Sequence, residues 1–96
     1  MVINGDISMT QSFLAISYPL SILDEIILKT IILHPGIVRG NLTDLIEKHH
    51  GIDTQTAFDV IMSLYTAGLI TIEYQQLKPV EGLKLEHGIA RIGGMA

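Results

Sequence analysis

The stretch Leu42–Ile70, LTDLIEKHHGIDTQTAFDVIMSLYTAGLI, contains the patterns from which the fold is predicted. Its first part, Leu42–His50, repeats apolar residues at helical spacing, and Gly51 follows in the position that commonly ends a helix. After a short link, a second helix is expected to begin near Thr54 and to run to Ala67. The stretch therefore predicts two helices that are joined by a tight turn.

Two flanking signals define the beginnings of these helices. Asn41 is the expected cap of the helix over 42–50, and Asp53 or Thr54 is the expected cap of the following one. A further helix is predicted over Ile22–Leu33, where Ser21 and Asp24 have the spacing of a capping box. That helix is apolar on more than one side, so we expect neighbouring elements to cover more than one of its faces.

Beyond Gly68, apolar and polar residues alternate, and this pattern predicts β-strands. The first strand is expected over 70–75 and the second over 83–87, and the sequence KPVEG at 78–82 supplies a five-residue loop between them. Residues 1–20 are interpreted as an N-terminal extension that packs on the body or at a dimer seam. Residues 21–88 form the predicted domain, and 89–96 are expected to be a flexible tail.

Three segments of this chain resemble the winged helix-turn-helix superfamily: LTDLIEK at 42–48, DTQTA at 53–57 and LYTAGLI at 64–70. The resemblance extends over about Ile22–His87. It implies an α+β fold, in which three helices are followed by a C-terminal β-hairpin called the wing. It also implies duplex DNA as a partner and transcription regulation as a role.

By this resemblance, the helix that begins at Thr54 would be a recognition helix, whose first residues face the major groove. A glutamine amide can pair with adenine, and a threonine methyl can contact thymine. The start of the preceding helix and the wing would then contact phosphates. The DNA-binding residues expected on these grounds are Arg39, Asn41, Thr43, Thr54, Gln55, Thr56, Lys78 and Lys84.

The charges of the chain argue against DNA binding. The chain has a net charge of −4, and its six Lys and Arg residues are scattered singly. Asp59 is predicted on the exposed face of the recognition helix, where it would repel phosphates. A second hypothesis therefore stands beside the first: a winged-helix module that binds a protein partner in a larger assembly, without binding nucleic acid.

The composition predicts a homodimer. Hydrophobic residues make up 48% of the chain and charged residues only 17%, so apolar surface remains after one small core has been filled. We expect one side of the helix over 22–33, together with the segment before it, to form the seam. The residues expected at this dimer or partner surface are Phe13, Leu14, Ile16, Tyr18, Leu28 and Ile32.

Several other classes of function are disfavoured by the sequence. The chain has no cysteine, which excludes disulfides and thiolate metal sites. His49 and His50 are adjacent on a helix and point about 100° apart, so they cannot chelate one ion from one face. No nucleophile elbow or phosphate-binding loop occurs, so neither enzymatic activity nor a cofactor is expected. The polar residues within 7–23 argue against a membrane span, and a cytoplasmic location is expected.

Overall fold

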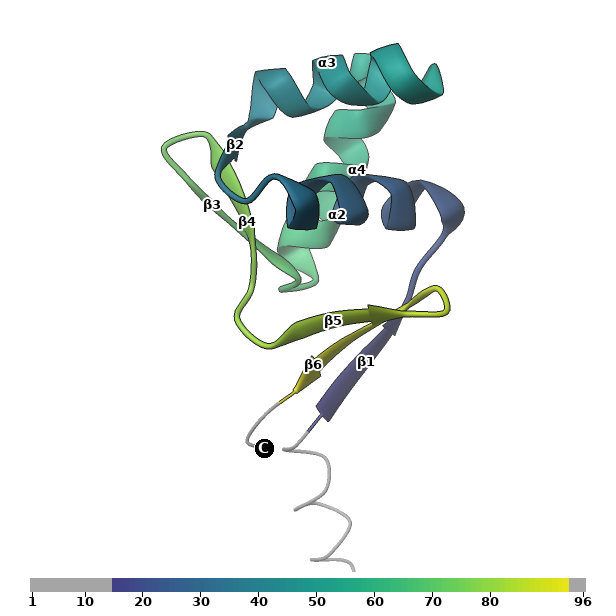
Figure 1. The fold of residues 1–96 in the computed structure, drawn as a ribbon, viewed down its shortest axis with the longest axis vertical. Helices are drawn as coiled ribbons and strands as arrows, with labels where there is room; N and C mark the ends of the chain where they lie inside the picture. The colour runs from purple at the N-terminus through teal and green to yellow at the C-terminus, as the bar shows by residue number, and fades with distance from the viewer. Residues whose placement is uncertain (1–14, 94–96) are drawn as a thin grey trace, which may run out of the picture.

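The computed structural model describes residues 15–93 and shows an α+β arrangement with three helices and antiparallel strands. The elements in chain order are β1 (Ala15–Pro19), α2 (Ile22–Leu33), β2 (Ile37–Val38), α3 (Arg39–His50), α4 (Thr54–Thr66), β3 (Ile70–Glu73), β4 (Gln76–Pro79), β5 (Leu83–Glu86) and β6 (Ile89–Gly93). The helices lie together at one end of the molecule, and β1, β5 and β6 lie at the other (Figure 1).

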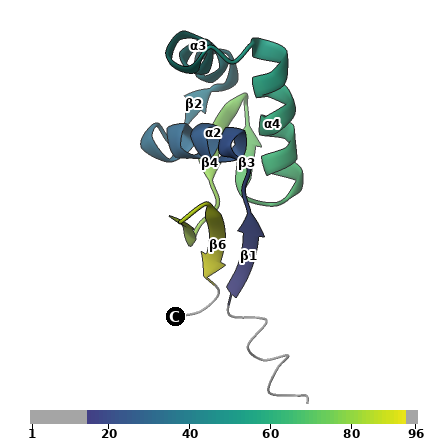
Figure 2. The ribbon, with the colours of Figure 1, turned by 90° about the vertical axis from the view of Figure 1, so that its right-hand side faces the viewer.

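The strands form two separate three-stranded sheets. One has the order β2-β4-β3, so the two-residue strand between α2 and α3 extends the hairpin that follows α4. The other has the order β1-β6-β5 and joins the beginning of the described chain to its end. Figure 2 shows the first sheet behind α2, with α4 to one side, and the second sheet below the helices.

The core is built from the inner faces of the helices and of the β2-β4-β3 sheet. Burying each Ile or Leu side chain stabilises the fold by about 1.5 to 3 kcal/mol. The buried hydrophobic residues are Ile27, Leu28, Ile31, Leu42, Ile46, Ala57, Ile61, Leu64, Leu69, Ile70, Leu77 and Ala90. Ala90 is the one core residue in this set that the second sheet contributes, and it connects that sheet to the helical body.

The predicted capping box of α2 is confirmed. The Ser21 hydroxyl accepts a hydrogen bond from the Asp24 backbone at 3.1 Å, and the Asp24 carboxylate accepts one from the Ser21 backbone at 3.1 Å. The prediction for α3 was wrong at its start, because this helix begins at Arg39 and has no side-chain cap. The Arg39 N–H instead donates to the Gln75 carbonyl at 2.8 Å, which ties the helix start to the β3–β4 turn.

The hairpin was predicted with the wrong second strand. The strand β3 pairs with β4 across a two-residue turn at Tyr74 and Gln75, and not with residues 83–87. Both turn residues have positive φ, 53° and 67°, which is typical of the tight type I′ turns that join antiparallel strands. The region expected to be a five-residue loop therefore contains the end of β4.

Residues 83–87 belong to the second sheet, where β5 turns through His87 and Gly88 into β6. The prediction of a flexible tail was wrong for 89–93, because these residues form β6, the central strand of that sheet. The expectation for 1–20 is tested only from residue 15 onward, where β1 pairs with β6. Residues 1–14 and 94–96 lie outside the described part of the chain.

Within residues 15–93, the helices are too short or too polar for any of them to cross a membrane.

Candidate partner-binding face

The exposed side of α4 is mostly polar and carries the acid Asp59, and the helix contains no Lys or Arg. Its apolar residues at helical spacing turn toward the core, which leaves Thr54, Gln55 and Asp59 exposed. The Gln55 amide donates a hydrogen bond of 2.9 Å to the Asp59 carboxylate one turn later on the same helix. The amide that was expected to pair with adenine is therefore already bound to a neighbouring acid.

Asp53 and Thr56 form a second such pair at the start of α4. The Thr56 hydroxyl donates to the Asp53 carboxylate, and this hydrogen bond lowers the pKa of Asp53 below its ordinary value of 3.8. Asp53 is thus held in its charged form at neutral pH. A negative charge at this point stabilises the amino-terminal end of α4, where the helix dipole is positive. The same charge repels an approaching phosphate.

Arg39 connects α4, α3 and the β3–β4 turn. Its guanidinium lies over the Phe58 ring on α4, with 5.0 Å between the guanidinium carbon and the ring centroid. Its backbone N–H donates to the Gln75 carbonyl in the turn. Arg39 therefore contacts α4 through its side chain and the β3–β4 turn through its backbone. We group the residues on the two sides of these contacts under the name α4–turn face: Arg39, Gln55, Phe58, Asp59 and Tyr74.

Tyr74 is the most exposed large side chain of this face. Its exposed fraction is 95%, and its φ of 53° lies in the left-handed region that a bulky residue rarely adopts. The neighbouring charge is the acid Glu73, which ends β3. An aromatic ring held at the tip of a tight turn is a common anchor for a partner, whereas the alternating sequence pattern predicts Tyr74 within a strand.

The residues predicted to contact DNA do not form one surface. Thr43 is 5% exposed and donates its hydroxyl to the Gly40 carbonyl at 3.0 Å, so its prediction as a phosphate ligand is wrong. Lys84 is on β5, opposite Arg91, in the other sheet. Lys78 is on β4 opposite Thr71, and its side chain runs past Gly36. The other predicted residues lie at helix starts: Arg39 begins α3, and Thr54, Gln55 and Thr56 begin α4.

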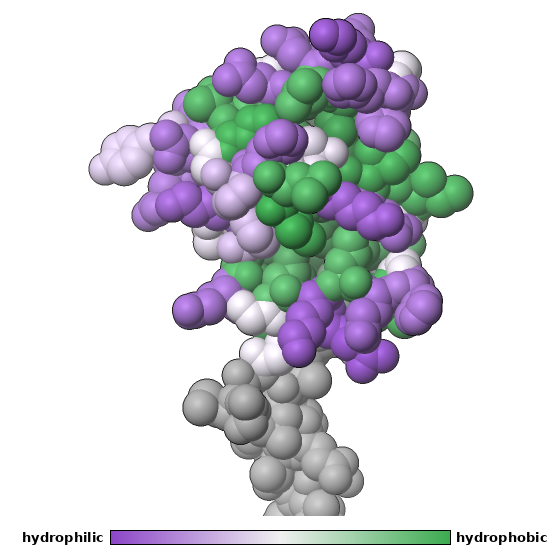
Figure 3. Space-filling view, in the orientation of Figure 1, coloured by the Kyte–Doolittle hydropathy of each residue, from purple (hydrophilic) through white to green (hydrophobic). Residues whose placement is uncertain are grey.

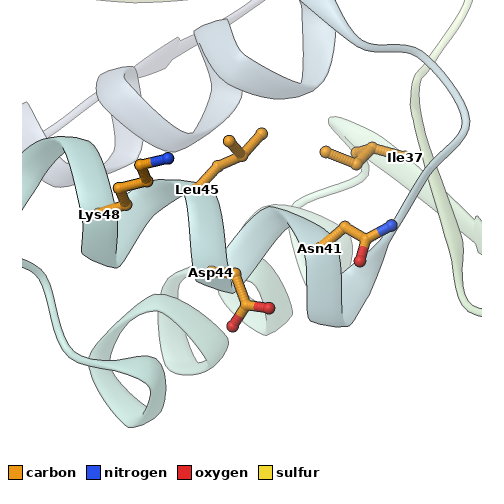
Figure 4. Close-up of a pocket in the computed structure, with 5 residues that line it drawn as sticks. All are labelled: Ile37, Asn41, Asp44, Leu45 and Lys48. Atoms are coloured by element: carbon orange, nitrogen blue, oxygen red, sulfur yellow. The ribbon is translucent and has the colours of Figure 1, made fainter.

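Asn41 lies apart from the α4–turn face, at a hollow on α3. The hollow has a volume of about 470 Å³ and is lined by Ile37, Asn41, Asp44, Leu45 and Lys48. In Figure 4, the side chains of Ile37 and Leu45 extend toward each other across the hollow, whereas Asn41 and Asp44 point to another side of α3. This hollow is open and mixed in character, and it holds no pair of groups arranged for catalysis.

The residues predicted for a dimer surface are divided by the structure. Leu28 is fully buried in the single chain, so its place at a seam was wrong. Tyr18 is partly buried against the core, and Ile32 is 37% exposed. Phe13, Leu14 and the side chain of Ile16 lie outside the described part of the structure.

His49 and His50, the pair considered for metal binding, are exposed at the end of α3. Among residues 15–93, no group of three or more His, Cys, Asp or Glu side chains is placed to hold a metal ion. Comparisons of this chain with protein-family models, with curated proteins and with solved structures found no match.

Proposed function

We propose that this chain is a winged-helix interaction module, whose α4–turn face binds a basic and apolar segment of a protein partner. The order α2, β2, α3, α4, β3, β4 supports the assignment to the winged-helix type, with β3–β4 as a short wing. The resemblance alone favoured DNA as the partner. The geometry of the face favours a protein.

The observation that carries the proposal is the charge of α4, of β3 and of the turn at Tyr74 and Gln75. Between Lys48 and Lys78 the chain contains no Lys or Arg, and it carries the acids Asp53, Asp59 and Glu73. This interval includes all of α4, β3 and the wing turn. Affinity for DNA depends on cations that neutralise phosphates. The cations that border this interval are Arg39, which is stacked on Phe58, and Lys78, which is on β4 opposite Thr71.

The chemistry of the face defines the partner. Tyr74 is almost fully exposed and Phe58 is partly exposed, so both offer aromatic surface. The exposed Asp59, which follows Phe58 on α4, offers a negative charge. A Lys or Arg of the partner can contact an aromatic ring and an acid together, and apolar neighbours of that cation can cover the remaining ring surface. A segment with one or two cations among apolar residues fits this description.

The test is selection of binding peptides from a random display library, with a random duplex DNA pool screened in parallel at low and at physiological salt. We expect basic and apolar peptides to be enriched and no DNA motif to be enriched. Tyr74→Ser and Asp59→Lys should each weaken the selected peptides about tenfold or more, because each removes a central contact.

The matched control for charge is Glu81→Lys, which makes a similar change at an exposed acid in the loop between β4 and β5. It should leave peptide binding unchanged. A DNA motif that is enriched at physiological salt would overturn the proposal in favour of a DNA-binding regulator. Peptides whose affinity is unaffected by both Tyr74→Ser and Asp59→Lys would place the binding surface elsewhere and would also contradict it.

A further inference from the structure

The outer side of α2 has apolar residues at both ends that the described elements leave exposed, and Ile26 between them is partly buried against the core. Ile22 and Leu33, at the two ends of the helix, are 78% and 74% exposed, and Ile32 next to Leu33 is 37% exposed. Ile22, Ile26, Lys29 and Leu33 follow one another at i, i+4, i+7 and i+11, so they lie along one line of the helix. The opposite side of the same helix, with Ile27, Leu28 and Ile31, is fully buried.

The middle of this line of residues is charged. Lys29 and Glu25 form an ion pair of 3.3 Å, with 60% and 30% of their side chains exposed. Figure 3, in the orientation of Figure 1, shows the result on the surface: hydrophobic atoms gather over α2 on both sides of a group of hydrophilic ones. Two exposed apolar ends with one cation and one anion between them make an unusual pattern for a solvated helix face.

This pattern is self-complementary. If the outer sides of two copies of α2 lie antiparallel about a two-fold axis, at the position of Ile27 along the helix but on the side opposite to its side chain, Ile22 of one copy lies next to Ile32 and Leu33 of the other. In the same arrangement, Lys29 of each copy faces Glu25 of the other, because the two residues lie at equal distances from the axis. Each apolar end then meets an apolar end, and each charge meets its opposite. A parallel arrangement would place like charges side by side.

We propose that the outer side of α2 is a homodimer interface, formed by antiparallel packing of α2 against α2 of a second copy. The proposal does not depend on the nature of the partner that binds the α4–turn face. The helix is about 18 Å long, so the seam is short, and we expect association that depends measurably on protein concentration.

The first experiment is sedimentation equilibrium of the full chain over a wide range of concentration. The wild type should approach twice its chain mass. Ile22→Lys should weaken the dimer about a hundredfold, because the two-fold axis repeats the lost contact and each loss costs about a factor of ten. Tyr74→Lys changes another exposed large side chain outside α2, and it should leave the dimer unchanged.

The second experiment is a charge exchange, which separates a folding defect from a lost interface. Glu25→Lys and Lys29→Glu each break the ion pair within the helix and place like charges across the seam, so each variant alone should dimerise about tenfold more weakly. An equimolar mixture of the two should associate as strongly as the wild type, since opposite charges again face each other between the chains. An unfolded variant could not restore association in this way.

Three results would overturn the proposal. These are a wild type that keeps the mass of one chain at every concentration, a dimer that Ile22→Lys leaves intact, and a mixture of the two charge variants that remains as weak as its components.

Discussion

The two sheets of this protein have the same plan but are held in place differently. Each consists of a hairpin with a two-residue turn and a third antiparallel strand from an earlier part of the chain. The β2-β4-β3 sheet packs against α2 and α4, and it buries Ile70 and Leu77 almost completely. The β1-β6-β5 sheet makes most of its contacts within itself, and Leu83, Leu85 and Ile92 are only partly buried.

This difference shows that topology and stability are separate properties. Backbone pairing is satisfied in both sheets, so the hydrogen bonds do not distinguish them. The two sheets differ instead in the apolar area that each buries against the helices. We therefore expect the β2-β4-β3 sheet to be part of the cooperative core and the β1-β6-β5 sheet to open first. Four sets of substitutions test this expectation.

The largest effect is expected from Leu77→Ala. Leu77 is fully buried in the central strand of its sheet, so the variant should lose about 2 to 5 kcal/mol of unfolding free energy. Leu83→Ala, in the partly buried sheet, should lose about half as much. Denaturant unfolding of both variants measures the difference, and equal losses would show that the two sheets belong equally to the core.

A smaller loss is expected from Gly82→Ala, just before β5. Gly82 has a φ of +83°, and a Cβ atom there would lie 3.0 Å from the Gly93 carbonyl oxygen. The left-handed backbone alone should cost about 1 to 2 kcal/mol. Gly40→Ala is the control, because no atom lies within 4 Å of its Cβ position in α3, and alanine should stabilise that helix by about 0.5 to 1 kcal/mol. If Gly82→Ala left the free energy of unfolding unchanged, β5 and β6 would have to shift apart without an energetic cost.

A gain is expected at the β3–β4 turn. Replacing Tyr74 and Gln75 by Asn and Gly gives the residues that a turn with two positive φ angles prefers, and should add about 1 kcal/mol of stability. The single change His87→Asn in the second sheet should add less, since Gly88 already occupies the other turn position. Thermal unfolding compares the two. If the turn variant is more stable and has also lost peptide binding, the left-handed Tyr74 is kept for its contact with the partner.

The smallest effect is expected from Arg91→Ala. The Arg91 guanidinium lies 3.4 Å from the Glu86 carboxylate, but about half of each side chain is exposed, at 51% and 57%. Such a surface pair contributes about 0.5 kcal/mol or less, and less still at high salt. Unfolding at two salt concentrations checks this. A loss above 1.4 kcal/mol, tenfold in the folding constant, would mean that the second sheet depends on its charges.

The helices could be predicted from the sequence because their signals are local. Ser21 and Asp24 mark one helix start, and Gly51 marks a helix end with a φ of 69°. The β3–β4 turn gave no such signal, because Tyr74 continues the alternation of Ile70 and Ile72 as a strand would. The pairing of β6 with β1 could not be predicted either, since it joins distant residues through backbone hydrogen bonds that no side-chain pattern records.

The positions of the candidate-site residues could be predicted from the sequence, but their hydrogen bonds could not. Helical spacing placed Gln55 and Asp59 on the exposed face of α4, and their separation of four residues already allowed the bond between them. Exposure alone did not show that the Gln55 amide would be bound. On α2, apolar residues surround the helix, so the sequence could not distinguish the buried Leu28 from the exposed Ile22 and Leu33.

The position of β6 also determines when the molecule can be completed. It is the central strand of its sheet, and it follows every other described element in the chain. During synthesis, β1, the helices and the β3–β4 hairpin leave the ribosome before β6, so β1 at first has no strand to pair with. Only when Ile89–Gly93 have emerged can Ser17 meet Arg91 and Ala90 enter the core. A chain cut before Ile89 would thus leave both its first strand and β5 unpaired, exposing the edges through which unfinished chains aggregate.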